Sequence, residues 1–176
     1  TEEIYGPGFS TYVYVEGLTE TLEGASRPGH FRGVATVVTI LFNTTRPDLA
    51  FFGSKDAQQV GVIKKLNKDL GYDTEIVVVP TVREESGLAM SSRNSLLSSE
   101  EREKAAIIYQ ALCKAKAAFK NGERNASELA QIVEEKISSE PAAKIDYVAV
   151  VNNDDLEPIE KIEDREIILS AAVFFG

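Results

Sequence analysis

Hydrophobic positions in the first half of the chain switch between strand-like and helical spacing. A β-rich run bounded by glycine, Tyr12–Val15, predicts a strand, and the glycine- and arginine-rich stretch Gly24–Gly33 predicts a loop. Apolar residues then recur at helical spacing over about Gly33–Thr45, and Pro47 prevents the helix from continuing.

Two short apolar runs frame a second helix. Asp48–Phe52 predicts one strand, Ala57–Leu70 predicts a helix that ends before Gly71, and Glu75–Val79 predicts another strand. The continuous Ile-Val-Val-Val run in the last strand is typical of a strand covered on both faces. Strand, helix and strand at this spacing predict a parallel sheet in an α/β fold.

The second half of the chain has a different order of elements. After the loop-like stretch Pro80–Leu97, the pair Ser98 and Glu101 has the spacing of a capping box, which predicts a helix that continues to Gly122. A further helix opens at Asn125 with Glu128. We expect strands at Lys144–Val151 and Arg165–Phe174, joined by an acidic loop, and hence a small α/β unit with an antiparallel sheet. The predicted domains are residues 1–81 and 82–176.

Composition and charge narrow the function. Hydrophobic residues make up 43% of the chain, enough for a folded core. The formal net charge of −9 argues against nonspecific nucleic-acid binding, which needs a basic face. No apolar run approaches the roughly 20 residues that span a bilayer, so we expect no membrane partner. The first residue is Thr1 and no secretory leader follows, so we expect a cytoplasmic protein and a chain that is part of something longer.

Single copies of cysteine and histidine restrict the chemistry further. One cysteine excludes an internal disulfide, and one histidine excludes a site with two imidazoles. We therefore expect no metal site built from this chain's own side chains. Cys113 lies in an apolar helical stretch, and we expect it to be a buried, unreactive thiol.

Two segments near predicted helix starts carry candidate chemistry. Residues 23–33 place Arg27, His30 and Arg32 at a helix N-terminus, where anions bind favourably, although the same residues could serve only as a turn that caps the helix. Residues 51–59 join a strand end to a helix, a position where open α/β sheets bind ligands. There Lys55 could reach a phosphate and Asp56 a ribose hydroxyl or Mg²⁺. The alternative is a plain turn with a solvent-facing Lys–Asp pair.

A third segment, residues 82–94, is a loop that ends in Ser91, Ser92 and Arg93. Two hydroxyls, backbone N–H groups and a guanidinium suit an oxyanion with several oxygens, such as a phosphate. The alternative is a mobile linker between domains.

Together these segments resemble the pantothenate synthetases, the pantoate–β-alanine ligase family. The resemblance covers essentially the whole chain and is strongest over residues 22–97. The motifs that carry it are Glu-Gly-x-x-Arg-Pro-Gly-His-Phe-x-Gly-Val at 23–34, Arg-Pro-Asp at 46–48, Phe-Phe-Gly-x-Lys-Asp-x-Gln-Gln at 51–59 and Val-Arg-Glu-x-x-Gly-Leu-Ala-Met-Ser-Ser-Arg-Asn at 82–94.

The resemblance implies a reaction and a fold. The family condenses (R)-pantoate with β-alanine: ATP adenylates pantoate with loss of pyrophosphate, and the amine of β-alanine then displaces AMP. Mg²⁺ accompanies the ATP. The implied fold is a Rossmann-like nucleotidyltransferase domain, of which this chain has part, followed by a small α/β C-terminal lid domain with an antiparallel sheet. The implied assembly is a cytosolic homodimer.

The resemblance also implies roles for individual residues. It assigns ATP contacts to Gly53, Ser54, Lys55, Asp56, Val82, Met90, Ser91, Ser92 and Arg93, of which Lys55, Ser91, Ser92 and Arg93 are the catalytic set. It assigns pantoate contacts to Gln59 and to the apolar wall Val34, Val37 and Val38. Arg27 and His30 are candidate anion contacts.

The chain departs from the family pattern in two ways. Ser54 stands where the family usually has Glu. The family's upstream Pro-Thr-Met-Gly…His-x-Gly-His segment, with its catalytic histidine, has no counterpart, and His30 belongs to another motif. We therefore expect a C-terminal fragment that is inactive alone. The alternatives are a non-catalytic folding or dimerisation fragment and another adenylate-forming enzyme of the nucleotidyltransferase superfamily.

Overall fold

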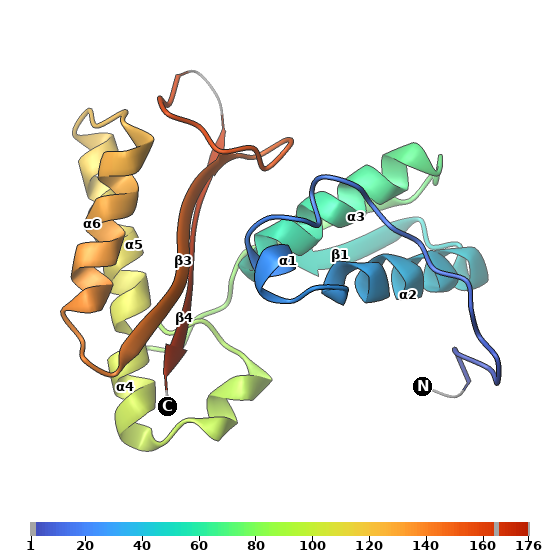
Figure 1. Ribbon diagram of the computed structural model, residues 1–176, viewed down its shortest axis with the longest axis horizontal. Helices are drawn as coiled ribbons and strands as arrows, with labels where there is room; N and C mark the ends of the chain where they lie inside the picture. Colours follow the sequence, from blue (N-terminus) through green and yellow to red (C-terminus); the bar gives the residue numbers. More distant parts are fainter. Residues whose placement is uncertain (1–2, 164–165, 176) are drawn as a thin grey trace. The chain divides into compact units, whose positions relative to one another are not determined.

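The computed structural model describes residues 3–163 and 166–175, and the chain divides into two compact units (Figure 1). The N-terminal unit is Thr1–Pro80 and the C-terminal unit is Thr81–Gly176. In the part of the chain that is described, no helix is both long and apolar enough to cross a membrane.

The N-terminal unit is built around a β–α–β arrangement. Its elements are α1 (Glu23–Ser26), α2 (His30–Thr45), β1 (Leu49–Gly53), the 3₁₀ turn η1 (Ser54–Asp56), α3 (Ala57–Asp69) and β2 (Glu75–Val79). The strands β1 and β2 pair in parallel, with Leu49 opposite Glu75 and Gly53 opposite Val79. The helix α3 forms the crossover that a parallel pair requires. The predicted parallel strands are confirmed.

One face of this two-stranded sheet is covered and the other is open. On the covered face, Ala50, Phe52 and Ile76 pack against buried side chains of α2 and α3. On the opposite face, Leu49 is 48% exposed and Phe51 is 63% exposed. The prediction that the β2 strand is covered on both faces is therefore wrong for this chain. Among the described residues, no second layer lies on the open face of the sheet.

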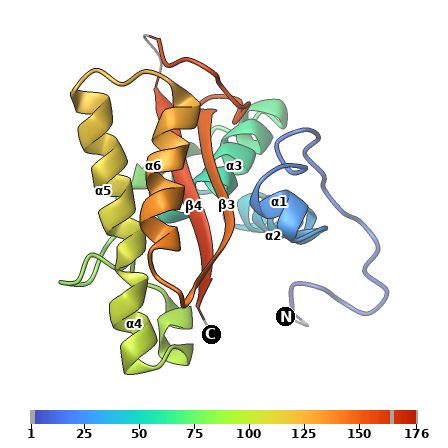
Figure 2. The ribbon, with the colours of Figure 1, turned by 60° about the vertical axis from the view of Figure 1, so that its left-hand side comes forward.

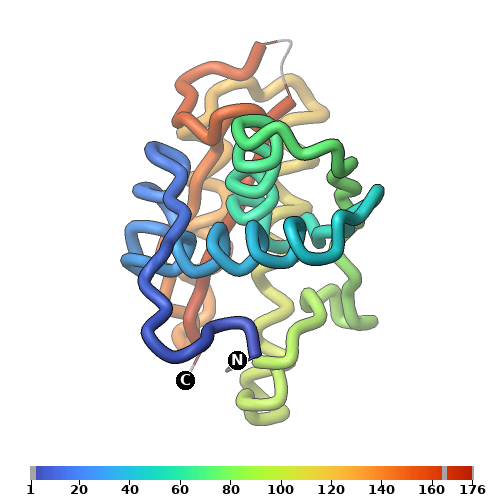
Figure 3. Tube along the Cα trace, turned by 90° about the vertical axis from the view of Figure 1, so that its right-hand side faces the viewer, coloured from blue at the N-terminus to red at the C-terminus, as the bar shows by residue number. Residues whose placement is uncertain are grey.

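The predicted strand at Tyr12–Val15 is also wrong, because these residues have no strand partner in the described chain. The segment instead crosses the first half of α2 (Figure 3). The Val13 N–H donates to the Thr36 hydroxyl over 2.9 Å, and Val15 is buried in a cluster with Phe31 and Ala35. The Val13 N–H is thus bonded to a helix side chain and not to a neighbouring strand, so the β-rich run does not belong to a sheet.

Two helix boundaries in this unit lie at glycines in the left-handed region. The helix α2 begins at His30, three residues before the predicted start, because Gly29 with φ of 81° supplies the turn that precedes it. The predicted loop Gly24–Gly33 therefore contains most of α1 and the first turn of α2. At the end of α3, Gly71 has φ of 67°; its N–H bonds the Lys68 carbonyl, and the Tyr72 N–H bonds the Asn67 carbonyl. These are the two hydrogen bonds of a Schellman motif.

The C-terminal unit packs helices on an antiparallel hairpin (Figure 2). Its elements are the 3₁₀ helix η2 (Ser92–Leu96), α4 (Ser99–Ala105), α5 (Ile107–Lys120), α6 (Ala126–Ser138), β3 (Ala143–Asn152) and β4 (Ile167–Phe175). The predicted antiparallel sheet is confirmed, with a register shift between Ile145 and Tyr147. The expected strand start at Arg165 lies outside the described residues.

Helix starts in this unit are those that the sequence predicts. Ser98 and Glu101 form a reciprocal capping box at α4, and the Asn125 side chain caps α6 by accepting from Ser127 and Glu128. The one helix expected from Ser98 to Gly122 is interrupted at Ala106, which separates α4 from α5.

Cys113 is exposed, so the prediction of a buried thiol is wrong. The buried positions of α5 are Ala111 and Ala115, one helical turn apart. Cys113 lies midway between them in sequence and thus about 200° around the helix from each, on the solvent side. The prediction failed because the apolar sequence neighbours of Cys113 do not show which side of the helix is buried.

Candidate functional site

The strand end of β1 presents the predicted Gly-Ser-Lys-Asp segment on the surface. Gly53 ends β1, the turn η1 follows, and α3 begins at Ala57. The Lys55 Nζ lies 3.5 Å from the Asp56 Oδ1, and these side chains are 38% and 62% exposed. The local geometry is that of a strand–turn–helix junction at the carboxyl end of a parallel strand, the position where open α/β sheets bind ligands.

The two adjacent glutamines of α3 have different environments. Gln58 is buried, and its amide nitrogen donates to the carbonyls of Leu18 (2.8 Å) and Thr21 (2.7 Å). Gln59 is half-buried, and its side chain makes no hydrogen bond to any described residue. The amide of Gln59 is thus available to a polar ligand, whereas Gln58 fastens the loop before α1. The sequence analysis named Gln59 as a ligand contact but assigned no role to Gln58.

The start of α2 brings Arg27 and His30 together. The Arg27 Nη1 donates to the Glu23 carboxylate over 2.7 Å and lies 3.5 Å from the His30 Nε2. Beside this turn is a hollow of about 300 Å³ between Pro28, Gly29 and the segment around Tyr14. The Arg27 charge is already shared with a carboxylate, so the segment has the structure of a turn, and no side chain caps the start of α2 among the described residues.

The three valines proposed as an apolar wall occupy one side of α2. Val38 is 7% exposed and lies in a buried cluster with Phe42 and Ile63. Val34 and Val37 are half-buried and pack against that cluster. Val34 and Val37 therefore retain accessible methyl surface, while Val38 mainly supports them.

In the C-terminal unit, residues 82–90 form a small hairpin that precedes the serines. Arg83 bridges Ala89 in antiparallel fashion, the Glu84 N–H donates to the Leu88 carbonyl over 2.8 Å, and the Met90 N–H donates to the Val82 carbonyl over 2.9 Å. These hydrogen bonds give the predicted loop a defined backbone.

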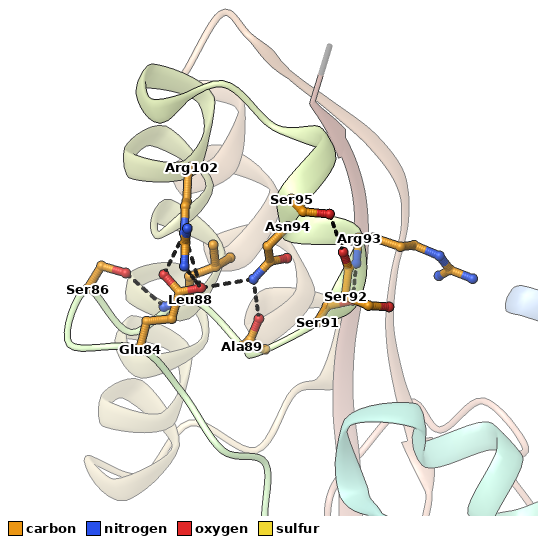
Figure 4. A network of polar contacts seen from close by, with 10 residues as sticks. All are labelled: Glu84, Ser86, Leu88, Ala89, Ser91, Ser92, Arg93, Asn94, Ser95 and Arg102. Carbon is orange, nitrogen blue, oxygen red and sulfur yellow. Dashed lines mark hydrogen bonds and ion pairs between the residues drawn. The ribbon is translucent and has the colours of Figure 1, made fainter.

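The Ser-Ser-Arg segment follows as a turn that leads into η2. The Ser91 hydroxyl accepts from the Arg93 N–H over 3.2 Å, and the Ser92 carbonyl accepts from the Ser95 hydroxyl over 2.7 Å. Ser92 and Arg93 are exposed, and the Arg93 side chain points away from the polar contacts around Glu84 (Figure 4). Met90 and Val82 are also exposed. The structure thus places Met90 to Arg93 together on one accessible turn.

Sequence reasoning missed the contacts that hold this turn. The Arg102 Nε–H is shared between the two oxygens of the Glu84 carboxylate, at 3.0 and 3.2 Å, and the Arg102 Nη2 donates over 2.8 Å. The Asn94 amide donates to the same carboxylate over 3.1 Å. The Arg102 hydrogen bonds lower the pKa of Glu84 below its ordinary value, and Glu84 in turn raises the pKa of Arg102. Glu84 and Asn94 belong to the matched motif, but nothing in the local pattern pointed to Arg102.

A grouping of three His, Cys, Asp or Glu side chains able to hold a metal ion does not occur among the described residues.

Comparison with known proteins gives this arrangement a family. The sequence profile described as pantoate-beta-alanine ligase matches residues 1–176. The chain belongs to the pantoate–β-alanine ligase family. Pantothenate synthetase from Acetivibrio thermocellus is 53% identical over 175 residues, and that from Carboxydothermus hydrogenoformans is 54% identical over 176 residues. Each match covers 99% of this chain and 62% of the relative.

Solved structures agree with the family membership. The crystal structure of pantothenate synthetase from Thermus thermophilus has a TM-score of 0.90 and 44% identity, covering 97% of this chain and 62% of that one. A pantoate-beta-alanine ligase from Francisella tularensis, complexed with beta-gamma ATP and beta-alanine, has a TM-score of 0.69 and 35% identity, covering 99% and 58%.

The family resemblance and the fold class predicted from the sequence are therefore confirmed. The fold is mixed α/β, with part of a nucleotidyltransferase fold followed by a small unit with an antiparallel sheet. This member of the pantoate–β-alanine ligase family spans less than two thirds of the length of these relatives.

Proposed function

We propose that this chain is the C-terminal part of an ATP-dependent ligase that condenses (R)-pantoate with β-alanine through a pantoyl-adenylate intermediate. The observation that carries the proposal is the family match over residues 1–176, which includes all three surface segments singled out above. The Francisella tularensis neighbour, complexed with beta-gamma ATP and beta-alanine, supports these substrates.

In the first step, a carboxylate oxygen of pantoate attacks the α-phosphorus of ATP, and the bond to the leaving pyrophosphate breaks. Negative charge accumulates on the α-phosphate and on the pyrophosphate. We assign Lys55, Ser91, Ser92 and Arg93 to the stabilisation of that charge. Loss of one such donor costs about 3 kcal/mol of transition-state stabilisation.

In the second step, the amine of β-alanine attacks the carbonyl carbon of the adenylate. The carbon–oxygen bond to AMP breaks, AMP leaves with the electron pair, and the nitrogen gives up a proton as the amide forms. Mg²⁺ usually binds substrate phosphates and retains several waters, so the proposal assigns it to the ATP.

Pantoate is assigned to the N-terminal unit. The available amide of Gln59 is suited to its hydroxyl or carboxylate oxygens. The half-buried methyl groups of Val34 and Val37, supported by Val38, are suited to its gem-dimethyl group. Gly53, Ser54 and Asp56 complete the ATP contacts at the strand end, while Val82 and Met90 supply those beside the Ser-Ser-Arg turn. Arg27 and His30 remain candidate anion contacts.

We also propose how the whole enzyme is divided into domains and assembled. Residues 1–81 are assigned to the nucleotide- and pantoate-binding domain and residues 82–176 to the lid. The enzyme is proposed to be a cytoplasmic homodimer, and this chain alone is proposed to be inactive.

The test uses a longer protein, called here the extended protein, in which this chain is completed with the remaining segments of the relative from Carboxydothermus hydrogenoformans. Arg93→Ala should lower pantoate-dependent pyrophosphate release by about a hundredfold, while the unfolding midpoint stays the same, because Arg93 is exposed. Normal pyrophosphate release in Arg93→Ala would refute the assignment of the turn.

Calorimetry on this chain separates the alternative functions. Binding of ATP–Mg²⁺ or pantoate would favour a ligand-binding part of the ligase, whereas no binding of either would favour a non-catalytic fragment. In the extended protein, pyrophosphate release that requires a carboxylate other than pantoate would favour another adenylate-forming enzyme.

A further inference from the structure

One carboxylate in the C-terminal unit, that of Glu84, accepts hydrogen bonds from the side chains of both Asn94 and Arg102. The Glu84 oxygens accept the Arg102 Nε at 3.0 and 3.2 Å, the Arg102 Nη2 at 2.8 Å and the Asn94 amide at 3.1 Å. The planar fork of arginine matches a carboxylate, and such bonds are stronger than neutral ones. We call Glu84, Asn94 and Arg102 the Glu84 cluster.

The Glu84 cluster holds both ends of the Ser-Ser-Arg turn. The Asn94 amide that donates to Glu84 also donates to the Ala89 carbonyl over 3.0 Å. Ala89 lies before Met90 and Asn94 follows Arg93, so the turn is bracketed by one side chain (Figure 4). Arg102 connects this bracket to α4, 18 residues from Glu84 in sequence.

The turn between these anchors is shaped by its own backbone. The Arg93 N–H donates to the Ser91 hydroxyl and the Asn94 N–H donates to the Ser91 carbonyl over 3.1 Å. The backbone is thereby fixed while Ser92 and Arg93 stay exposed. Donors held in place before a reaction need no reorganisation when charge develops, which is where most electrostatic catalysis arises.

A second anchor ties the hairpin to α5. The Arg83 guanidinium lies 4.1 Å from the ring centroid of Tyr109, and a Cβ added to Gly87 would lie 2.4 Å from the Tyr109 Cδ1. Gly87 also has φ of 91°, which side chains rarely adopt. Leu88 is buried next to it in sequence. The hairpin is therefore attached to two helices.

An ordinary surface ion pair would not support a special role, because most contribute between 0 and about 1 kcal/mol. The Glu84 side chain differs in being only 19% exposed and in bonding an arginine fork together with an amide. By contrast, the carboxylate of Glu100, which pairs with Lys104 on α4, is 77% exposed.

We propose that the Glu84 cluster is a positioning device that presents Ser91, Ser92 and Arg93 to the phosphates of ATP. This inference rests on the proposed function of that turn. Glu84, Asn94 and Arg102 act through the turn and do not themselves touch the substrate. Their loss should therefore reduce the rate of adenylation more than the affinity for pantoate or the stability of the fold.

The test compares Glu84→Gln with the matched control Glu100→Gln in the extended protein. Glu84→Gln keeps the shape and an acceptor for Asn94 but removes the charge that holds Arg102. We expect the kcat for pantoate-dependent pyrophosphate release to fall by about tenfold or more, with KM for pantoate within about twofold. Glu100→Gln should stay within about twofold of the unchanged protein in both values.

A conservative replacement of Arg102 and a double variant test whether Glu84 and Arg102 act through the same contact. Arg102→Lys keeps the charge but loses the fork, so kcat should fall between the values of the unchanged protein and Glu84→Gln. The double variant Glu84→Gln with Arg102→Gln should be no slower than the slower of the two single variants Glu84→Gln and Arg102→Gln, because both substitutions remove the same contact. Fully additive losses would contradict the proposal.

Amide hydrogen exchange on this chain supplies a readout independent of activity. In Glu84→Gln, the amides of Arg93 and Asn94 should exchange about tenfold faster, while those of α5 and α6 keep their protection. Unchanged exchange at Arg93 and Asn94 would overturn the inference. So would equal acceleration throughout the C-terminal unit, which would indicate a merely structural role.

The two proposals fail in different ways. If Arg93→Ala leaves pyrophosphate release normal, the function assigned to the turn is refuted. If Arg93→Ala slows release but Glu84→Gln behaves like Glu100→Gln, the proposed function stands and the positioning role is refuted.

Discussion

The two units of this chain differ in how completely their apolar side chains are buried and their helix starts are capped. In the C-terminal unit, one continuous cluster joins α5, α6 and both strands, with Leu129, Val133 and Ile137 almost fully buried. In the N-terminal unit, the buried residues form two clusters, and the sheet keeps Leu49 and Phe51 exposed. A two-stranded parallel sheet with an open face is an unusual end state, because parallel sheets are normally covered on both faces.

Helix starts show the same difference. Ser98 and Asn125 cap α4 and α6 with their side chains. In the N-terminal unit, the N-cap residues Gly29 and Asp56 provide no side-chain hydrogen bond to α2 or α3 among the described residues. Two helix starts of the C-terminal unit are thus capped by side chains, whereas α2 and α3 begin without such a cap, within the segments that we propose to bind substrate.

One chain thus combines a unit with a single continuous core and a unit whose sheet keeps an exposed apolar face. The family match, in which the chain spans only 62% of two curated relatives, agrees with this difference. Four predictions test it, beginning with the largest expected effect.

The largest effect concerns catalysis by this chain alone. Adenylation needs pantoate and ATP held in line, and the family resemblance assigns the catalytic histidine to a His-x-Gly-His segment that this sequence lacks. We expect pantoate-dependent pyrophosphate release by the chain to be more than about a hundredfold slower than by the extended protein. A continuous pyrophosphate assay measures both. Release by the chain within that factor would show that the N-terminal unit is functionally complete.

Core truncation should show that the units unfold separately. Ile137 is completely buried in the cluster of the C-terminal unit, so Ile137→Ala should cost about 2–5 kcal/mol of unfolding free energy there. Native-state hydrogen exchange in urea should show the loss in α5 and α6 and leave α3 unchanged. The control Leu96→Ala, at a residue 83% exposed, should change stability by less than about 0.5 kcal/mol. An equal loss in both units would contradict the comparison.

Removing a helix cap should have a smaller effect and should depend on pH. Ser98→Ala removes the side-chain half of the capping box and should cost about 1 kcal/mol. The backbone N–H of Ser98 and its hydroxyl lower the pKa of Glu101 below the ordinary 4.5. A lowered carboxyl pKa stabilises the fold above pH 4.5, and this contribution is lost as the pH falls through the folded pKa.

Titration by NMR measures this prediction. In Ser98→Ala, the pKa of Glu101 should move back toward 4.5, and the acid-induced fraying of α4 should become shallower. Glu101→Gln should remove this part of the pH dependence. An unchanged Glu101 pKa in Ser98→Ala would show that the cap does not act on that carboxylate.

The smallest expected effect on stability tests the open face of the sheet. Phe51 is 63% exposed, so Phe51→Lys should change the free energy of unfolding by less than about 0.5 kcal/mol. It should nevertheless reduce self-association of the chain in sedimentation experiments, because exposed apolar faces and strand edges promote association. Phe174→Lys, at a residue 57% exposed in the C-terminal unit, is the control. An equal reduction by Phe174→Lys would remove the distinction between the two units.

Local signals predicted most of the fold. The capping residues Ser98 and Asn125, the helix-ending Gly71 and the apolar run Glu75–Val79 each act over a few residues, and the structure has them where the pattern placed them. Tyr12–Val15 failed because strand propensity does not specify a partner. The Val13 N–H instead donates to the Thr36 hydroxyl on α2, 23 residues away in the sequence.

The candidate site shows the same limit. Motifs located the surface segments around Lys55 and Arg93, because functional residues cluster in short loops. They could not reveal that Gln58 is engaged in holding a loop, or that Arg102 holds Glu84 across 18 residues. Side-chain contacts between distant segments depend on packing, and packing has no short-range signature.

The contact between Gly87 and Tyr109 has a spectroscopic consequence. The Cβ direction of Gly87 points at the edge of the Tyr109 ring, so a Gly87 α-proton lies within the magnetic field of the ring current. The chemical shift of that proton therefore reports whether the hairpin is docked on α5, and it supplies a built-in probe for the segment that carries Ser91 to Arg93.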